Sequence, residues 1–231
     1  MTRVTVTPDD EAAARRAADV MANQINDART RDADVHIAVA GGSTPRRAYE
    51  LLALMQGTWA HVHLWLGDER CVPADHEDAN QRMVDESLLP QLRSSEGPHL
   101  HPVRGELEPE DAAWLYGQDL VRAMGEQPVF DLVLLGLGPD GHTASLFPDH
   151  PEARTAEAPV IPVRGAPKPP PERITLTLPV LARARFTMLL ATGASKREAL
   201  AGVRAGDDRL PPARLGEALD EIVCDEAAVD G

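Results

Sequence analysis

The chain has 231 residues, of which 43% are hydrophobic and 26% charged, the balance of a globular protein with a substantial core. Its 37 acidic residues outnumber the 23 basic ones, and the formal charge of −14 argues against nucleic acid or an anionic membrane as a partner. No apolar run approaches the roughly 18 residues of a membrane span. Without a signal-like segment, and with two cysteines that make no disulfide framework, we expect a cytoplasmic protein.

Short apolar runs alternate with helical patterns along most of the chain. In chain order the pattern predicts a strand over residues 4–7, a helix over 10–28, a strand over 35–40, a helix over 46–55, a strand over 62–66, helices over 78–89 and 110–124, strands over 130–135, 160–163, 174–178 and 186–190, a helix over 195–203 and a last strand over 221–224. This alternation predicts an α/β fold of three layers, a mostly parallel sheet with helices on both faces. We interpret the proline-rich stretch 166–171 as an ordered connector, and therefore expect one domain over residues 1–231.

Ligands bind to such sheets at the loops beyond the carboxyl ends of the strands. The loop Gly41-Gly42-Ser43-Thr44-Pro45 lies between a predicted strand and a predicted helix. Its glycines let the backbone approach a ligand closely, and the helix N–H groups and dipole favour a phosphate, with two hydroxyl groups as further donors. An ordinary strand-to-helix turn with a Ser/Thr cap is the alternative. No Gly-Lys-Ser/Thr follows, so this is not a Walker loop.

The loop Gly136-Leu-Gly-Pro-Asp140-Gly-His142 also follows a predicted strand and matches the G-x-G-x-x-G pattern of dinucleotide sites. Pro148 leaves only about a turn for the helix that such a site needs, which disfavours a dinucleotide. His142 is a candidate general base, since its ordinary pKa lies near 6.5. A structural or surface histidine is the alternative. Ser145 lacks the G-x-S-x-G elbow of a hydrolase nucleophile.

Charged groups follow two further predicted strands. The run Asp68-Glu69-Arg70 can offer a carboxylate to a sugar hydroxyl and a guanidinium to an anion. The segment 192–196 ends on Lys196 at a predicted helix start, where a phosphate ligand is useful. Only two of the 23 basic residues are lysines, Lys168 and Lys196, so their positions are informative. Solvated charges are the alternative for both segments.

Two histidine pairs and a cysteine carry weaker signals. His61 with His63, and His99 with His101, have the spacing of a shared strand face, but no third ligand for a metal is identifiable. Cys71 is adjacent to an arginine that can lower a thiol pKa, and we interpret it nevertheless as an inert thiol.

Five segments in register closely resemble the 6-phosphogluconolactonase family. They are residues 38–45, residues 65–70 with Val72, Pro73 and Asn80, and residues 136–148, 167–177 and 192–196. The resemblance runs from about residue 10 to the C-terminus. It implies a modified Rossmann fold of the sugar-phosphate isomerase and deaminase superfamily. It also implies hydrolysis of 6-phospho-D-glucono-1,5-lactone to 6-phosphogluconate, the second step of the oxidative pentose phosphate pathway, with no metal or organic cofactor.

This resemblance suggests a role for each candidate residue. His142 would take a proton from the attacking water, and Asp140 would orient the loop or the imidazole. The residues expected at the 6-phosphate are Gly41, Gly42, Ser43, Thr44 and Lys196. Positive charge near the phosphate or the developing oxyanion is expected from Arg70, Lys168 and Arg173. Asp68 would hold a sugar hydroxyl.

Two other functions are open. Glucosamine-6-phosphate deaminase shares the phosphate loop and the Asp-Gly-His element, but continues to an Asn-Glu-Pro ending. Here the ending is Leu146-Phe147-Pro148, without the carboxylate that assists ring opening, which favours a lactonase. A non-catalytic sugar-phosphate sensor is the second alternative, and no helix-turn-helix or basic region accompanies the domain. We expect a small sugar-phosphate lactone as the partner, and a monomer or weak homodimer.

Overall fold

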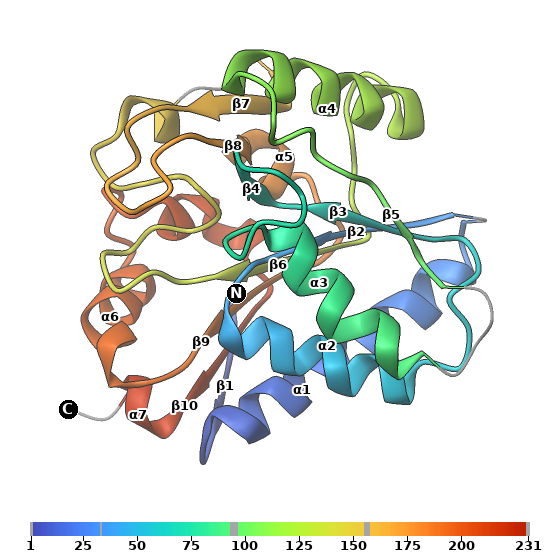
Figure 1. Cartoon of the computed structure of the whole chain (residues 1–231). Coiled ribbons are helices and arrows are strands. Elements are labelled where there is room, and N and C mark those ends of the chain that lie inside the picture. Colours follow the sequence, from blue (N-terminus) through green and yellow to red (C-terminus); the bar gives the residue numbers. More distant parts are fainter. Residues whose placement is uncertain (1, 33, 93–96, 155–157, 230–231) are drawn as a thin grey trace.

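A computed structural model describes residues 2–32, 34–92, 97–154 and 158–229. Within these ranges, seven parallel strands form the main sheet in the order β1-β10-β9-β6-β2-β3-β5 (Figure 1). They are β1 (Arg3–Thr7), β2 (Val35–Val39), β3 (Val62–Leu66), β5 (His99–Leu100), β6 (Leu132–Gly136), β9 (Thr187–Ala191) and β10 (Glu221–Asp225). A smaller antiparallel sheet has the order β4-β8-β7 and consists of β4 (Asp68–Arg70), β8 (Arg173–Leu176) and β7 (Val160–Val163).

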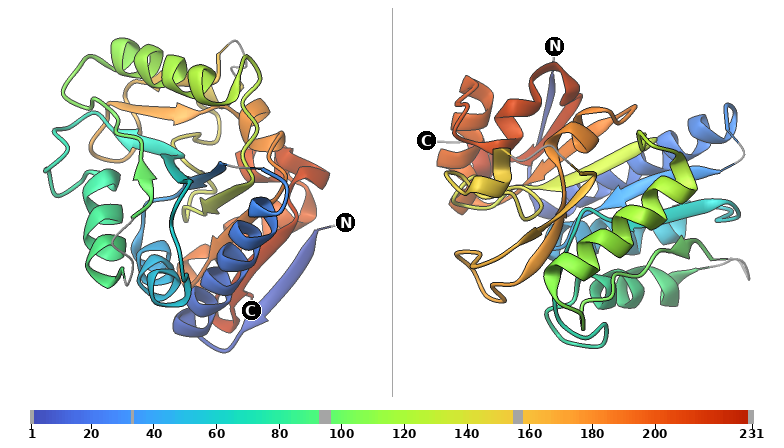
Figure 2. Two further views of the ribbon diagram at one scale, coloured as in Figure 1. Left: turned by 90° about the vertical axis from the view of Figure 1, so that its right-hand side faces the viewer. Right: turned by 90° about the horizontal axis from the view of Figure 1, so that it is seen from above.

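Helices lie on both sides of the main sheet. The long helices are α1 (Asp10–Arg29), α2 (Ser43–Met55), α3 (Asn80–Leu88) and α4 (Pro109–Met124). The first three lie together on one side, and α4 lies on the other, above the smaller sheet (Figures 1 and 2). The shorter helices are α5 (Leu178–Ala182), α6 (Arg197–Ala205) and α7 (Glu226–Val229). Short 3₁₀ segments occur at Leu89–Gln91, Pro151–Arg154 and Ala194–Lys196, and a longer one, interrupted at Gly216, spans Pro211–Ala218. No helix among the described residues is long and apolar enough to cross a membrane.

Local sequence explains why α1 and the central strands form. The Asp9 side chain accepts a hydrogen bond from the Ala12 N–H at 2.7 Å and so caps α1, whose buried face is rich in alanine. Strands β6 and β9 are continuous apolar runs, because both faces of a parallel sheet are covered. The core is therefore shared between the sheet and the helices on both sides of it.

Two buried tyrosines secure the strand ends that lead to the candidate site. The Tyr49 hydroxyl on α2 bonds the backbone N–H and carbonyl of Ala40 at 2.9 and 2.8 Å, just after β2. The Tyr116 hydroxyl on α4 accepts from the N–H of Leu66, the last residue of β3, at 2.6 Å. Backbone polar groups that are buried at a strand end need hydrogen-bond partners. Here the helices on each side of the sheet supply a tyrosine hydroxyl for this purpose.

The order of the strands creates a crevice. From β2 the chain passes to β3 and β5 on one side, and then returns to β6 on the other side of β2. Strands β2 and β6 are neighbours, but the loops that follow them turn to opposite sides of the sheet. A crevice therefore forms between these loops at the carboxyl edge of the sheet.

The predicted α/β fold with a mostly parallel sheet is confirmed. The predictions of element ends differ by a few residues: α2 begins at Ser43 rather than residue 46, and α3 at Asn80 rather than 78. Strands β4 and β5 were not predicted, since neither has an apolar run. Strand β4 consists of three charged residues and exists because it pairs with β8.

Candidate active site

Two adjoining cavities of about 470 and 310 Å³ open at the carboxyl edge of the main sheet. The residues that line both are Gly41, Gly42, Gly136, Leu137 and Lys196. The first cavity continues toward the loop after β9, and the second toward β4 and the loop after β6. The four loops singled out from the sequence therefore meet at one place, which the topology alone favours as a ligand site.

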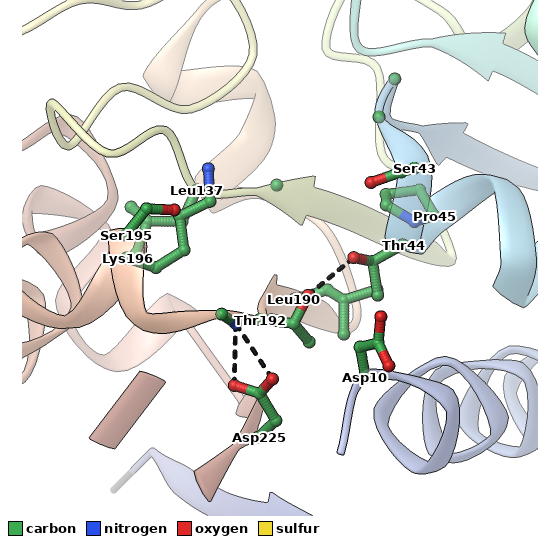
Figure 3. Close-up of a pocket in the computed structure, with 14 residues that line it drawn as sticks. Asp10, Ser43, Thr44, Pro45, Leu137, Leu190, Thr192, Ser195, Lys196 and Asp225 are labelled. Atoms are coloured by element: carbon green, nitrogen blue, oxygen red, sulfur yellow. Dashed lines mark hydrogen bonds between the residues drawn. The ribbon is translucent and has the colours of Figure 1, made fainter. Parts of the chain in front are cut away.

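The first cavity has the features of an anion site. In Figure 3, Ser43 and Thr44 lie on one side of it and Lys196 on the other. Helix α2 has no side-chain cap, and the N–H groups of Ser43 and Thr44 make no hydrogen bond within the described chain. Gly42 has φ of 115°, a backbone conformation that favours glycine. The exposed N–H groups and helix dipole match the needs of a phosphate.

Neighbouring loops hold this first cavity in shape. The hydroxyl groups of Thr44 and Thr192 are hydrogen-bonded at 2.7 Å, which joins the loop after β2 to the loop after β9. Asp225 accepts from the Gly193 N–H at 2.9 Å. A Cβ atom on Gly41 would lie 2.1 Å from the Asn80 side-chain oxygen, so this position needs glycine.

Lys196 lies between the two cavities at the start of α6. Burial lowers its pKa, and the positive charge of Lys168 nearby lowers it further. Within the described residues no carboxylate is hydrogen-bonded to this half-buried ammonium, so an incoming anion would stabilise it. Lys196 is thus placed to bind a phosphate group from the side opposite α2.

His142 lines the second cavity, and its side chain is 17% exposed. Its Nδ1 lies 2.5 Å from Asp140 Oδ1, and the Lys168 ammonium donates to that same oxygen at 3.0 Å. A carboxylate accepts, so we assign the proton to Nδ1, which leaves the Nε2 lone pair free. Within the described chain Nε2 has no hydrogen-bond partner, so it is available to accept a proton.

Charge around His142 sets its protonation. Burial lowers the pKa of the imidazole, Asp140 opposes this, and Lys168 adds to the lowering. Burial raises the pKa of Asp140, but its hydrogen bonds from His142 and Lys168 outweigh burial and lower the pKa overall. At neutral pH the pair is therefore a neutral imidazole held by an ionised carboxylate.

The glycines of the loop after β6 make room for this imidazole. A Cβ atom on Gly138 would lie 2.0 Å from Nδ1 of His142, and the Gly138 N–H donates to the His142 carbonyl at 2.8 Å. Gly141 has φ of 86°. No helix follows Gly141 within the described residues up to Pro151, so the loop lacks the dipole that a dinucleotide needs.

Asp68 lies at the floor of the second cavity and is 7% exposed. The Ser145 hydroxyl donates to its Oδ2 at 2.5 Å, and the Asn80 amide donates to its Oδ1 at 3.3 Å. Ser145 is fully buried, and its proton is already donated to this carboxylate. This geometry fits a supporting role for Ser145 and disfavours a nucleophile there.

Arg70 and Arg173 are paired across β4 and β8, and both line the second cavity. Arg173 donates to the carbonyl groups of Pro170 and Lys168, each at 2.9 Å, and so shapes the proline-rich segment. Arg70 donates to the Asp78 carbonyl, whereas its Nε is buried and has no hydrogen-bond partner among the described residues. Both guanidinium groups are thus partly engaged with backbone carbonyls, and both add positive charge to the wall of the second cavity.

Several groups at the site were not predicted to have a role. The Phe147 ring lies 4.7 Å from the His142 ring, and the Arg173 guanidinium lies 5.6 Å from the Phe147 ring centre. Asn80 belongs to a recognised segment, but the sequence carries no signal for its contact with Asp68. These contacts join residues from distant segments, and local spacing does not reveal them.

The weaker sequence signals are resolved by geometry. His61 precedes β3 and has φ of 61°, so it does not share a strand face with His63. Among the described residues no group of three or more His, Cys, Asp or Glu side chains is arranged to hold a metal ion. Burial raises the pKa of Cys71 to about 11, which agrees with an inert thiol.

The crevice at the carboxyl edge of the sheet, the uncapped start of α2 and the His142–Asp140 pair define an α/β protein with a cleft whose donors suit a small anionic ligand. The model of the family described as glucosamine-6-phosphate isomerases/6-phosphogluconolactonase matches residues 8–223. The chain belongs to this family.

Named relatives within the family are similar over most of the chain. The 6-phosphogluconolactonase of Synechocystis is 41% identical over 194 residues, covering 81% of this chain and 79% of that protein. The Streptomyces coelicolor 6-phosphogluconolactonase is 36% identical over 226 residues, covering 88% and 83%. The 6-phosphogluconolactonase structure from Thermotoga maritima superposes with a TM-score of 0.85 at 28% identity, covering 98% and 100%. A monomeric glucosamine-6-phosphate deaminase, 20% identical with a TM-score of 0.81, shares the fold.

Proposed function

We propose that this chain hydrolyses 6-phospho-D-glucono-1,5-lactone to 6-phosphogluconate, with His142 as the general base. The observation that carries the proposal is the position of His142. Its free Nε2 belongs to a cavity that adjoins an anion site, and Asp140 holds its other nitrogen at 2.5 Å. The curated relatives named 6-phosphogluconolactonase support this assignment.

The phosphate of the substrate binds in the first cavity. The N–H groups of Ser43 and Thr44 and the ammonium of Lys196 surround it, with Gly41 and Gly42 allowing close approach. The lactone ring then extends into the second cavity toward His142. This arrangement explains how a chain with a charge of −14 binds an anion, since a few local donors suffice for one phosphate ester.

The chemical step begins at the lactone carbonyl. Nε2 of His142 takes a proton from a water molecule as the water oxygen forms its bond to C1, giving a tetrahedral oxyanion. When the oxyanion collapses, the bond from C1 to the ring oxygen breaks and the imidazolium returns the proton to that oxygen. Asp140 remains ionised throughout, fixes the tautomer and stabilises the imidazolium.

Cations stabilise the negative charge that develops on the carbonyl oxygen. The side chains of Arg70 and Lys168 both line the second cavity, and the Lys168 ammonium lies beside the His–Asp pair. Asp68, fixed by Ser145 and Asn80, accepts from a sugar hydroxyl. Arg173 acts by holding the backbone that carries Lys168. One copy of the chain supplies all of these groups, which fits a single domain that works as a monomer or weak homodimer.

The purified chain tests the proposal against its neighbour in the family. Freshly prepared lactone is supplied at controlled pH, proton release is followed, and spontaneous hydrolysis is subtracted. We expect rapid hydrolysis of the lactone and no ammonia release from glucosamine 6-phosphate. Ammonia release without lactone hydrolysis would overturn the proposal in favour of a deaminase, and binding without turnover of either compound would favour a sensor.

A further inference from the structure

Glu69 is a buried carboxylate that faces away from the candidate site. It lies in β4 between Asp68 and Arg70, both of which line the second cavity, whereas Glu69 does not. Successive side chains of a strand point to opposite faces, so Glu69 points toward α3. It is only 3% exposed, and within the described chain no cation is hydrogen-bonded to it.

The Glu69 carboxylate binds three backbone N–H groups. Oε1 accepts from Arg70 at 2.7 Å and from Asn80 at 2.8 Å, and Oε2 accepts from Gln81 at 2.7 Å. Asn80 and Gln81 are the first two residues of α3, and Ala79 at the cap position has no side chain that can cap. A glutamate from a distant strand therefore caps this helix, and its negative charge also suits the positive end of the helix dipole.

The groups that Glu69 holds are in contact with the site. The Asn80 amide donates to the backbone carbonyl of Asp68 at 2.9 Å and to its carboxylate at 3.3 Å. The Asn80 side-chain oxygen packs against Gly41, at the join of the two cavities. Arg70 donates to the carbonyl of Asp78, two residues before α3.

We propose that Glu69 is a positioning residue for lactone hydrolysis, which fixes the start of α3 and through it the orientation of Asn80, Asp68 and Arg70 at the lactone end of the site. This inference rests on the proposed function. Glu69 itself touches neither cavity. It acts mainly on the groups that surround the reacting carbonyl. Toward the phosphate end its influence is limited to the packing of Asn80 against Gly41, and neither Ser43 nor Lys196 contacts it in the described chain.

Protonation of Glu69 gives the inference a separate readout. Burial raises its pKa to about 7, the three N–H groups oppose the rise, and the neighbouring charge of Asp68 adds to it. A protonated carboxyl places an O–H where one oxygen now accepts, so one of the two N–H groups at the start of α3 loses its acceptor. As the pH falls through 7, protonation of Glu69 therefore loosens the start of α3. We expect kcat to fall with it.

The test compares Glu69→Gln with a matched control, Glu221→Gln. Glu221 is also a buried glutamate, 2% exposed, but it lies at the amino edge of the sheet and binds Arg16 and Thr5. We expect both variants to lose thermal stability. We expect Glu69→Gln to lower kcat about tenfold, which is the scale expected when groups around the reacting atoms are misplaced. KM and the affinity for 6-phosphogluconate should change less than about threefold, because the phosphate end of the site is little affected. Glu221→Gln keeps kcat within about twofold of the parent, as expected away from the site.

The pH profile completes the design. In the parent chain kcat declines as the pH falls through 7. In Glu69→Gln this decline is absent, and the decline that remains at lower pH is due to protonation of His142, whose pKa lies below its ordinary value. A second variant, Glu69→Ala, removes all three accepted hydrogen bonds, and we expect a larger loss of kcat than in Glu69→Gln. Equal kcat and pH profiles in Glu69→Gln, Glu221→Gln and the parent chain would overturn the positioning role. A parent chain without lactonase activity would instead overturn the proposed function, and this inference with it.

Discussion

Two regions of this molecule place histidines in contrasting surroundings. At the carboxyl edge of the sheet, His142 is paired with Asp140 and leaves Nε2 free toward a cavity. Nearer the amino end of the strands, His36, His63 and His99 lie in register across β2, β3 and β5. Burial lowers the pKa of His142, His36 and His63 alike.

The second region, which we call the histidine row, comprises His36, His63, His99 and His101. Its rings are engaged with one another and with Trp65. His63 Nδ1 lies 3.0 Å from His101 Nε2, the Trp65 N–H donates to His36 at 3.1 Å, and Trp65 stacks on His101 with ring centres 3.5 Å apart. The contrast teaches that a lowered pKa does not itself mark a catalytic base. Asp34 also lies 3.6 Å from Nε2 of His63, so a nearby carboxylate does not mark one either. What sets His142 apart is that its second nitrogen is free beside a cavity, and the proposed role as a base rests on that.

The largest expected effect separates the two regions directly. His142→Ala removes the proposed base and lowers kcat by about 10²–10⁴-fold, the usual contribution of general acid–base catalysis. His101→Phe keeps a ring against Trp65 and leaves kcat within about twofold, since it lies outside both cavities. Steady-state lactone assays of the two variants, alongside 6-phosphogluconate binding, make the comparison. Equal losses in both variants would remove the distinction drawn here.

The next effect concerns the anion end of the site. Lys196→Ala removes a charged donor from the first cavity, and a hydrogen bond to a charged group is worth about 1.5–3 kcal/mol. We expect 6-phosphogluconate binding to weaken about 10- to 100-fold, with a much smaller change in kcat. Calorimetric titration measures the affinity. An unchanged affinity would show that the phosphate binds elsewhere.

Asp140→Asn changes the partner of His142 and leaves the imidazole in place. The carboxylate raises the pKa of His142 against the effect of burial, so its removal lowers that pKa further. The base acts in its neutral form, so the decline of kcat/KM at acid pH that is due to His142 shifts to lower pH. The maximal value of kcat/KM also falls. The pH profiles of parent and variant measure the shift. A shift to higher pH would contradict the assignment of Asp140.

The smallest effect is on stability at acid pH. Burial lowers the pKa of His101 to about 3, and neighbouring histidines add to the lowering. The folded state therefore binds fewer protons than the unfolded state, so the row's contribution to stability is complete above pH 6.5 and is lost as the pH falls toward 3. His101→Phe should reduce the acid-induced fall in Tm by about 2–4 °C. Thermal melts at pH 7.5 and 5 test this, and identical falls would contradict it.

Sequence patterns predicted the parts of this protein that rest on local chemistry. Buried strands such as β6 are apolar runs, and the glycines around Ser43 and His142 mark loops that need close approach. These features follow from short stretches of sequence, so the fold class and the loops of the candidate site were predictable.

Contacts between distant segments were not predictable in the same way. Strand β4 has no apolar pattern and forms only by pairing with β8. Glu69 caps a helix that begins eleven residues later, and Ser145 binds Asp68 across 77 positions. The spacing of His61 and His63 suggested one strand face, but the backbone turns at His61. Each of these depends on tertiary packing, which overrides local propensity.

A crystal structure with 6-phosphogluconate tests the central claim most directly. The account predicts the phosphate between the start of α2 and Lys196, and the C1 end of the product in the second cavity beside His142. A product bound with its phosphate at His142, or lodged outside both cavities, would contradict it.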